Sequence, residues 1–235
     1  MRWRNRARGA AAAALLSFWV LTLAVLAKGR ALGLNAALDD PLRRRFAGHQ
    51  QLLGLARALG SRDALVIGLG VLVAGSLLLR RGRTALVVLI ALPAAGALVE
   101  RVLKPLVSAS APTNSHPGYP SGHAAGSTAL ATTVLLLLLP PAAVGRRSGG
   151  LLRVFSGLLA LSLASATAIA VVALDQHNAA SAVGGALLAG SVVLCTALGV
   201  DAVCERRPEP ARRHRRPGAR PSGRAGPRSR PGASC

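Results

Sequence analysis

The sequence is poor in aromatic residues, acidic residues and cysteine, and each shortage excludes a class of function. Aromatic side chains make up 3% of the 235 residues, which leaves little to stack against nucleic-acid bases. The three cysteines, Cys195, Cys204 and Cys235, have the spacing neither of a disulfide framework nor of a metal site. We therefore expect no nucleic-acid partner, no metal and no other cofactor.

The scarcity of acidic residues gives the chain a formal net charge of +21, with 29 Lys and Arg against 8 Asp and Glu. The positive charges are concentrated beside apolar segments. Four arginines occur in the first eight residues, and ten occur between Arg206 and Arg230. Charges in such positions set the orientation of membrane helices. We expect the basic tail either to lie on anionic lipid headgroups or to serve only as a topology anchor.

Long apolar runs are what the sequence has in abundance. Hydrophobic residues account for 51% of the chain, and an apolar run of about 20 residues can cross the membrane as a helix. These runs predict an all-α fold, a polytopic membrane helical bundle of about six transmembrane helices. The expected spans are Ala10 to Ala27, Ala64 to Leu79, Thr84 to Val99, Ser121 to Leu139, Leu151 to Leu174 and Ala179 to Val200.

The spans divide the chain into four parts. We expect residues 1–27 to form a basic N-terminus and the first span, residues 28–63 an amphipathic segment at the membrane surface, residues 64–200 a membrane core, and residues 201–235 a disordered basic tail. Within the second part, Asp39, Asp40 and Pro41 predict the start of a short helix. In the third span, Pro93 predicts a kink.

The distribution of arginine predicts which span ends share a side of the membrane. The N-terminus, the arginine clusters at 80–83 and 146–147, and the tail all fall on one side, which should be the cytoplasm. The segments 107–120 and 175–178 then lie together on the outer face. The bias toward Ala, Arg and Gly is typical of a GC-rich gene, so we expect an integral protein of a bacterial plasma membrane.

The first polar motif that membrane packing does not explain is Tyr119-Pro-Ser-Gly-His123, at the start of the fourth span. Ser121 is suited to cap the helix, and Gly122 lets a ligand approach the backbone. The N–H groups of a first helical turn attract an anion. His123 on this turn is placed to donate a proton to the leaving oxygen of a bound anion.

The second motif is Asp175-Gln-His177-Asn178, at the start of the sixth span. Two histidines at two helix N-termini on one side of the membrane suit covalent phosphoryl transfer, in which one attacks phosphorus and the other protonates the departing alkoxide. Lys104, four residues after Glu100 at the outer end of the third span, is placed to hold phosphate as a point charge. Taken singly, each of these residues also fits an ordinary interfacial side chain or a snorkelling anchor.

The order of these motifs resembles the type 2 phosphatidic acid phosphatase (PAP2) superfamily, whose pattern is K-x6-R-P, P-S-G-H and S-R-x5-H-x3-D. The chain has Lys104, Pro112, Pro-Ser-Gly-His123 and His177, followed by a small-residue helix, and the resemblance covers residues 64–200. It implies a six-span phosphatase of lipid phosphates or diphosphates that needs no metal. By this resemblance His177 is the nucleophile, His123 the general acid, and the phosphate-binding residues are Lys104, Ser121 and Gly122.

Three positions depart from the family pattern. Counting along the motifs places Ala111 and Val171 where the family has arginine, and Ser181 where it has aspartate. The family arginines hold phosphate oxygens, and the loss of one charge-assisted donor typically costs about 10²–10³ in rate. Ser181 lies one helical turn after His177, so it is placed to bond to the imidazole ring, although it brings no charge.

Two other residues are candidates to replace the missing charges, Asp175 by folding back onto His177 and Arg101 by sharing a helix face with Lys104. The function that we expect is a phosphatase, a membrane enzyme that removes phosphate from a lipid-linked phosphate or diphosphate at the outer face through a phosphohistidine. One alternative is a catalytically impaired relative that binds lipid phosphates or scaffolds a membrane assembly. Another is a small transporter.

Overall fold

The computed structural model describes residues 2–28, 33–110, 118–138 and 150–206. The sequence positions Ala111, Pro112, Arg146 and Arg147, and the tail beyond Arg206, lie outside these residues. Within the described ranges the chain consists of helices joined by turns, with no strand. The predicted all-α membrane fold is confirmed.

Each predicted span coincides with a helix. These helices are α1 (Arg2–Lys28), α4 (Arg62–Leu78), α5 (Gly82–Ala97), α7 (Gly122–Leu138), α8 (Gly150–Ala173) and α9 (Ala179–Arg206). Four described stretches are long and apolar enough to cross a membrane, and these are Arg4–Lys28, Gly82–Ala109, Val154–Ala173 and Ala179–Glu205. Helix α4 makes a fifth when it is joined to α3 (Gln50–Ala58) across a bend of 48°. Since α7 has only 17 residues, length and composition support four or five spans rather than the predicted six.

The third span is longer than the predicted Thr84 to Val99. Helix α5 continues through Pro93 into a π-helical turn, η2 (Leu98–Leu103), and then into α6 (Lys104–Ser110). Glu100 and Lys104 neutralise each other here, because their side chains form an ion pair of 2.6 Å. The helix carries three charged residues past the predicted end of the span, Glu100, Arg101 and Lys104, and this ion pair offsets the cost of two of them.

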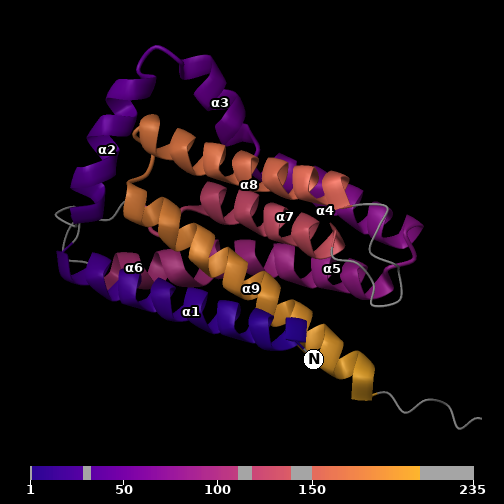
Figure 1. The fold of residues 1–235 in the computed structure, drawn as a ribbon. Coiled ribbons are helices and arrows are strands. Elements are labelled where there is room, and N and C mark those ends of the chain that lie inside the picture. Colours follow the sequence, from indigo (N-terminus) through magenta and orange to yellow (C-terminus); the bar gives the residue numbers. More distant parts are fainter. Residues whose placement is uncertain (1, 29–32, 111–117, 139–149, 207–235) are drawn as a thin grey trace, which may run out of the picture.

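The last span also extends further than predicted, since α9 ends at Arg206 and not at Val200. The first six residues that the sequence assigned to the disordered tail are thus helical. Glu205 on this extension forms an ion pair of 2.6 Å with Arg4 near the start of α1. The first turn of α1 and the last turn of α9 therefore meet at one end of the bundle (Figure 1).

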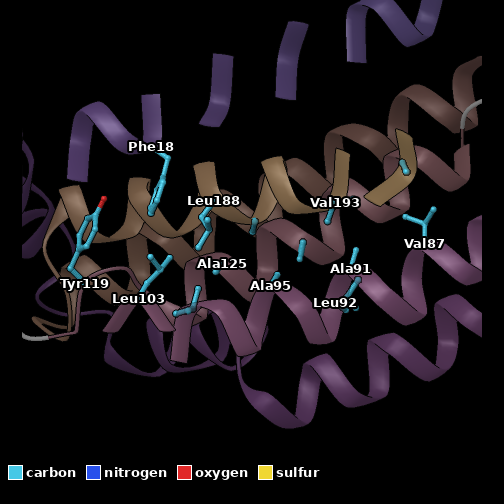
Figure 2. Packing of buried hydrophobic residues seen from close by; sticks show 14 of the residues in the cluster. Phe18, Val87, Ala91, Leu92, Ala95, Leu103, Tyr119, Ala125, Leu188 and Val193 are labelled. Atoms are coloured by element: carbon cyan, nitrogen blue, oxygen red, sulfur yellow. The ribbon is translucent and has the colours of Figure 1, made fainter. Parts of the chain in front are cut away.

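Helix α9 lies at the centre of the bundle, between α1, α5 and α7 (Figure 1). Figure 2 shows the buried side chains along these contacts, with Phe18 from α1, Leu103 from η2, Ala125 from α7 and Leu188 from α9 directed toward one another. Many of the buried residues on α7 and α9 are alanines and glycines, which allow helix backbones to approach closely. This close packing holds the starts of α7 and α9 in a fixed relation.

The predicted amphipathic segment folds as two helices, α2 (Gly33–Phe46) and α3, which form a V at the end of the bundle where α9 begins (Figure 1). The prediction that a helix starts at Asp39 is wrong, since α2 begins at Gly33 and contains Pro41 in its interior. The reason is tertiary. The side chains of Asn35 and Asp39, one turn apart on α2, accept hydrogen bonds from the N–H groups of Ala180 (2.9 Å) and Ala179 (2.8 Å). Asp39 therefore caps α9 instead of α2.

Candidate active site

The turn that precedes α7 lies against the first turn of α9. The N–H of Ser121 donates to the carbonyl oxygen of Ser181 at 3.0 Å. A Cβ atom on Gly118 would lie 2.9 Å from Cε1 of His177, and the φ of +75° at Gly118 is one that glycine adopts without strain. The structure thus brings together the two histidine motifs that the sequence singled out.

Helix α7 begins as the sequence predicted, with Ser121 as its N-cap. The hydroxyl oxygen of Ser121 accepts a hydrogen bond from the N–H of Ala124 at 3.4 Å, and the side chain is fully buried. The next residue, Gly122, needs its missing side chain, because a Cβ there would lie 2.5 Å from Oε1 of Glu100. The missing side chain leaves a space at the start of α7, and the carboxylate of Glu100 from the third span lies in it.

The side chain of Lys104, the residue that follows the π-helical turn η2, reaches the same space beside Gly122. Its Nζ is 2.6 Å from Oε1 of Glu100 and would lie 3.8 Å from a Cβ on Gly122. Both Lys104 and Glu100 are also within electrostatic range of His123 and His177. π-Helical turns often mark functional sites, and this one places the ammonium group beside the first turn of α7.

His177 is held through the Nδ1 edge of its ring. The hydroxyl of Ser181 lies 3.4 Å from Nδ1 and donates its own proton to the carbonyl oxygen of Gly118 at 3.3 Å. Because that proton is committed to Gly118, the hydroxyl oxygen is left to accept Nδ1–H. The ring then carries its free electron pair on Nε2, the nitrogen that a nucleophile needs.

The environment of His177 keeps its ring neutral. Burial lowers the pKa of His177 to about 4, and the positive charges of Lys104 and His123 act in the same direction, against the opposing effect of Glu100. At neutral pH the imidazole is thus unprotonated. The site therefore holds a neutral histidine beside a cationic group, which suits attack on a phosphorus atom.

The N-terminus of α9 is used by the protein itself. Besides the bonds from Asp39 and Asn35, the side-chain oxygen of Asn178 accepts the N–H of Ser181 at 2.8 Å. Burial raises the pKa of Asp39, while the bond from Ala179 opposes that rise. The first N–H groups of α9 are therefore already bonded to side chains of the protein.

A polar cavity of about 350 Å³ lies between residues 175–178 and α2, and His177 is part of its lining. Its lining includes three carboxylates, those of Asp39, Asp40 and Asp175, and one guanidinium, that of Arg43. A net negative lining disfavours a phosphate group.

The structure gives different surroundings to the two residues predicted to compensate for missing charges, Asp175 and Arg101. Asp175 has φ of 57° and forms an ion pair of 2.7 Å with Arg43 of α2. Its observed partner is thus the α2 helix, and its role in orienting His177 stays a prediction. Arg101 is exposed on the π-helical turn, and its part in binding phosphate also stays a prediction.

Val171 stands where the PAP2 pattern that the sequence resembles has an arginine. Its side chain is fully buried and packs against Ala124 of α7 and Ala182 of α9. Its carbonyl oxygen accepts the N–H of His177 at 3.1 Å. The position therefore fixes the backbone of the loop that carries His177, although its side chain carries no charge.

A guanidinium group that the sequence did not connect with the site comes from Arg57 on α3. Arg57 is half-buried and within electrostatic range of His123. Its helix is tied down close by, since Ala56 accepts a hydrogen bond from Thr167 of α8 at 2.8 Å, and a Cβ on Gly60 would lie 2.3 Å from the carbonyl oxygen of His123. Sequence spacing gave no signal for this approach, because it depends on how α3 docks on α7 and α8.

Comparison with known proteins gives two findings. The family model described as the PAP2 superfamily matches residues 102–203, which include the Lys104, His123 and His177 positions. Among solved structures, the chain is similar to a transmembrane PAP2-type phosphatidylglycerolphosphate phosphatase from Bacillus subtilis. The TM-score is 0.62 and the identity 18%, over 84% of this chain and 98% of that chain. No curated protein matches the chain. At this identity the structural likeness speaks for the fold alone.

Proposed function

We propose that the protein is a membrane phosphatase that removes phosphate from a lipid-linked phosphate or diphosphate, because the PAP2 superfamily model matches residues 102–203. The observation that carries the proposal is the convergence of His177, His123 and Lys104 beside the start of α7. Each has the chemistry that one part of a phosphoryl transfer requires. Candidate lipids include phosphatidic acid, polyprenyl diphosphate and phosphatidylglycerolphosphate, the last being what the similar Bacillus subtilis enzyme is named for.

In the proposed reaction, Nε2 of His177 attacks phosphorus while the ester P–O bond breaks and His123 gives its proton to the departing oxygen. Water then attacks the phosphohistidine, the P–N bond breaks, and His123 takes a proton back from the water. Lys104, Ser121, Gly122 and the first turn of α7 hold the phosphoryl oxygens. The hydroxyl of Ser181, 3.4 Å from Nδ1, keeps the ring in the tautomer that leaves Nε2 free.

Arg57 is proposed to supply the guanidinium that Ala111 and Val171 do not. Support comes from its half-buried position beside His123 and from the close docking of α3 on the start of α7. A guanidinium at this place can hold a phosphoryl oxygen and stabilise the charge that develops in the transition state.

The site is proposed to face the outer leaflet, with both termini and the basic tail in the cytoplasm. Support comes from the ends of the bundle. The basic start of α1 meets the end of α9 at one end, whereas α7 and α9 begin at the other (Figure 1). In this orientation residues 28–63 cover the site from outside, residues 64–200 form the membrane core, and residues 201–235 lead from the last span into the tail.

The test is phosphate release by the purified full chain in detergent from the three lipids, with His177→Ala and His49→Ala measured beside it. His49 is an exposed histidine near the start of α3, so its variant controls for the loss of an imidazole elsewhere. We expect release to disappear in His177→Ala and to persist in His49→Ala. Acid-labile radiolabel that accumulates on the protein from a phosphorus-labelled lipid, and only when His177 is present, supports the covalent step. Equal release from wild type and His177→Ala would refute the proposal.

The alternative is a relative that binds lipid phosphates without turnover. The burial of uncharged Val171 and Ser181, at positions where the family carries charge, favours it. Tight binding of the lipids with no phosphate release and no label on His177 would decide for this alternative.

A further inference from the structure

The side chain of Glu100 lies where the site would hold a phosphate oxygen. Its Oε1 is 2.6 Å from Nζ of Lys104 and would be 2.5 Å from a Cβ on Gly122, the first residue of α7. An oxygen in this position faces both an ammonium group and the positive end of a helix, which are the two features that attract an anion. The carboxylate thus has the surroundings expected for a substrate oxygen.

The charge of Glu100 also reaches the reacting groups. Both histidines are within its electrostatic range, as they are within that of Lys104. A phosphate placed between Lys104 and the two histidines would therefore approach the carboxylate closely, and like charges so near one another repel. Glu100 and a phosphate oxygen compete for the same partners.

The structure allows Glu100 to leave. Its side chain is 54% exposed, whereas that of Lys104 is 28% exposed, so the carboxylate has room to turn away while the ammonium group stays at the site. Since Glu100 belongs to the π-helical turn η2, its displacement requires no change in α7 or α9. A rotation of one side chain is sufficient.

We propose that Glu100 is an internal counter-anion, which pairs with Lys104 until a phosphate displaces it and which returns to expel the inorganic phosphate product. The inference rests on the proposed function in so far as that function places the phosphate beside Lys104 and Gly122. It adds a residue that sets the affinity of the site for phosphate. Through this competition Glu100 keeps Lys104 over the start of α7 and limits inhibition by the product.

The test measures equilibrium binding, because removing Glu100 also alters the electrostatics of both histidines and hence the rate. Binding of inorganic phosphate to the purified full chain in detergent is compared for wild type, Glu100→Gln and Glu205→Gln. Glu205 is a matched control, since it also forms an ion pair of 2.6 Å with a basic side chain but lies near the other end of the bundle. Glu100→Ala serves as a second variant, and the thermal midpoint of each protein reports whether it is folded.

We expect Glu100→Gln and Glu100→Ala to bind inorganic phosphate at least about tenfold more tightly than wild type, and Glu205→Gln to bind as wild type does. Unchanged or weaker binding in folded Glu100 variants would overturn the inference, and so would a lack of binding in every protein. Tighter binding of inorganic phosphate by the Glu100 variants, without phosphate release from any lipid, would support the counter-anion role and contradict the proposed phosphatase function. Normal phosphate release together with unchanged phosphate binding would refute the counter-anion role of Glu100 and would still support the phosphatase function.

Discussion

Gly185 of α9 lies against the carbonyl oxygen of Ser121, the residue that caps α7, so closely that a Cβ on Gly185 would be 2.3 Å from that oxygen. The contact is between backbones, and it occurs next to the turn that carries His123. The small residues of α9 that follow His177 therefore have a structural role. They let α9 approach α7 closely enough for the two histidine motifs to share one site.

Replacement of Gly185 by alanine is expected to destabilise the protein. The oxygen it meets belongs to the backbone of a buried turn and cannot move away as a flexible side chain would, so we expect a loss of about 1–3 kcal/mol. Gly190→Ala on the same helix is the matched control, because a Cβ there meets nothing within 4 Å, and alanine improves helix propensity. The thermal midpoints of the two variants in detergent check this, and equal midpoints would contradict the close crossing.

On the acid side of its pH profile, kcat/KM is expected to fall near pH 4. The pKa of His177 is lowered to about 4 by burial and by the charges of Lys104 and His123. The imidazole that we propose as the nucleophile therefore stays neutral as the pH falls below the ordinary histidine value, and it protonates only near pH 4. The measurement is kcat/KM against pH.

Two variants should move this acid limb of the pH profile in opposite directions. Lys104→Ala removes a charge that lowers the pKa of His177, so the limb should shift to higher pH. Glu100→Gln removes a charge that raises this pKa, so the limb should shift to lower pH. Shifts of the same sign in both variants would exclude His177 as the group that titrates.

Arg57→Ala is expected to lower kcat/KM by about 10–10², since it removes a charge-assisted donor beside His123. Arg57→Lys should recover part of the loss, because lysine keeps the charge without the planar guanidinium. Arg44→Ala, which removes an exposed arginine of α2, should leave the rate unchanged. Equal rates for Arg57→Ala and Arg44→Ala would show that the α3 guanidinium does not contact the substrate.

Asp39→Ala is expected to destabilise the protein by about 1 kcal/mol through the loss of a cap on α9. Asp39→Asn keeps an oxygen for the N–H of Ala179. Burial raises the folded-state pKa of Asp39, so the folded state binds this proton more tightly than the unfolded state does. Stability from Asp39 is therefore greatest at low pH and falls as the pH rises through 3.8 toward the raised pKa.

At neutral pH the asparagine variant should thus be at least as stable as wild type, and its thermal midpoint should depend less on pH between 3 and about 7. Thermal unfolding of the three proteins across this range provides the measurement. A lower midpoint for Asp39→Asn than for Asp39→Ala would show that the charge, and not the hydrogen bond, supports α9.

Apolar run length and cap chemistry are local properties, and where they governed the outcome the sequence predicted the structure closely. The spans at Ala64 to Leu79 and Leu151 to Leu174 match α4 and α8 to within two residues at each end. Ser121 caps α7 as expected. In the same way, the motif order identified a PAP2 resemblance that the family model confirms over residues 102–203.

Predictions failed where a distant part of the chain supplied the deciding contact. Asp39 looked like the start of its own helix but caps α9, because α2 docks across the N–H groups of Ala179 and Ala180. Asp175 is paired with Arg43, a contact that the sequence did not indicate, while its role in orienting His177 stays a prediction. In both cases a polar side chain near a helix end had several possible partners, and spacing along the chain does not rank them.

The sequence by itself determined that this is a helical membrane protein with two histidine motifs at the starts of two spans, because hydropathy and helix capping act over a few residues. Only the tertiary structure decided which charges surround those histidines. It brought Arg57 within electrostatic range of His123, set Glu100 and Lys104 close to Gly122, and put uncharged Val171 in the core. Electrostatic and hydrogen-bond partners are set by distance in space, and that distance follows from how the helices pack.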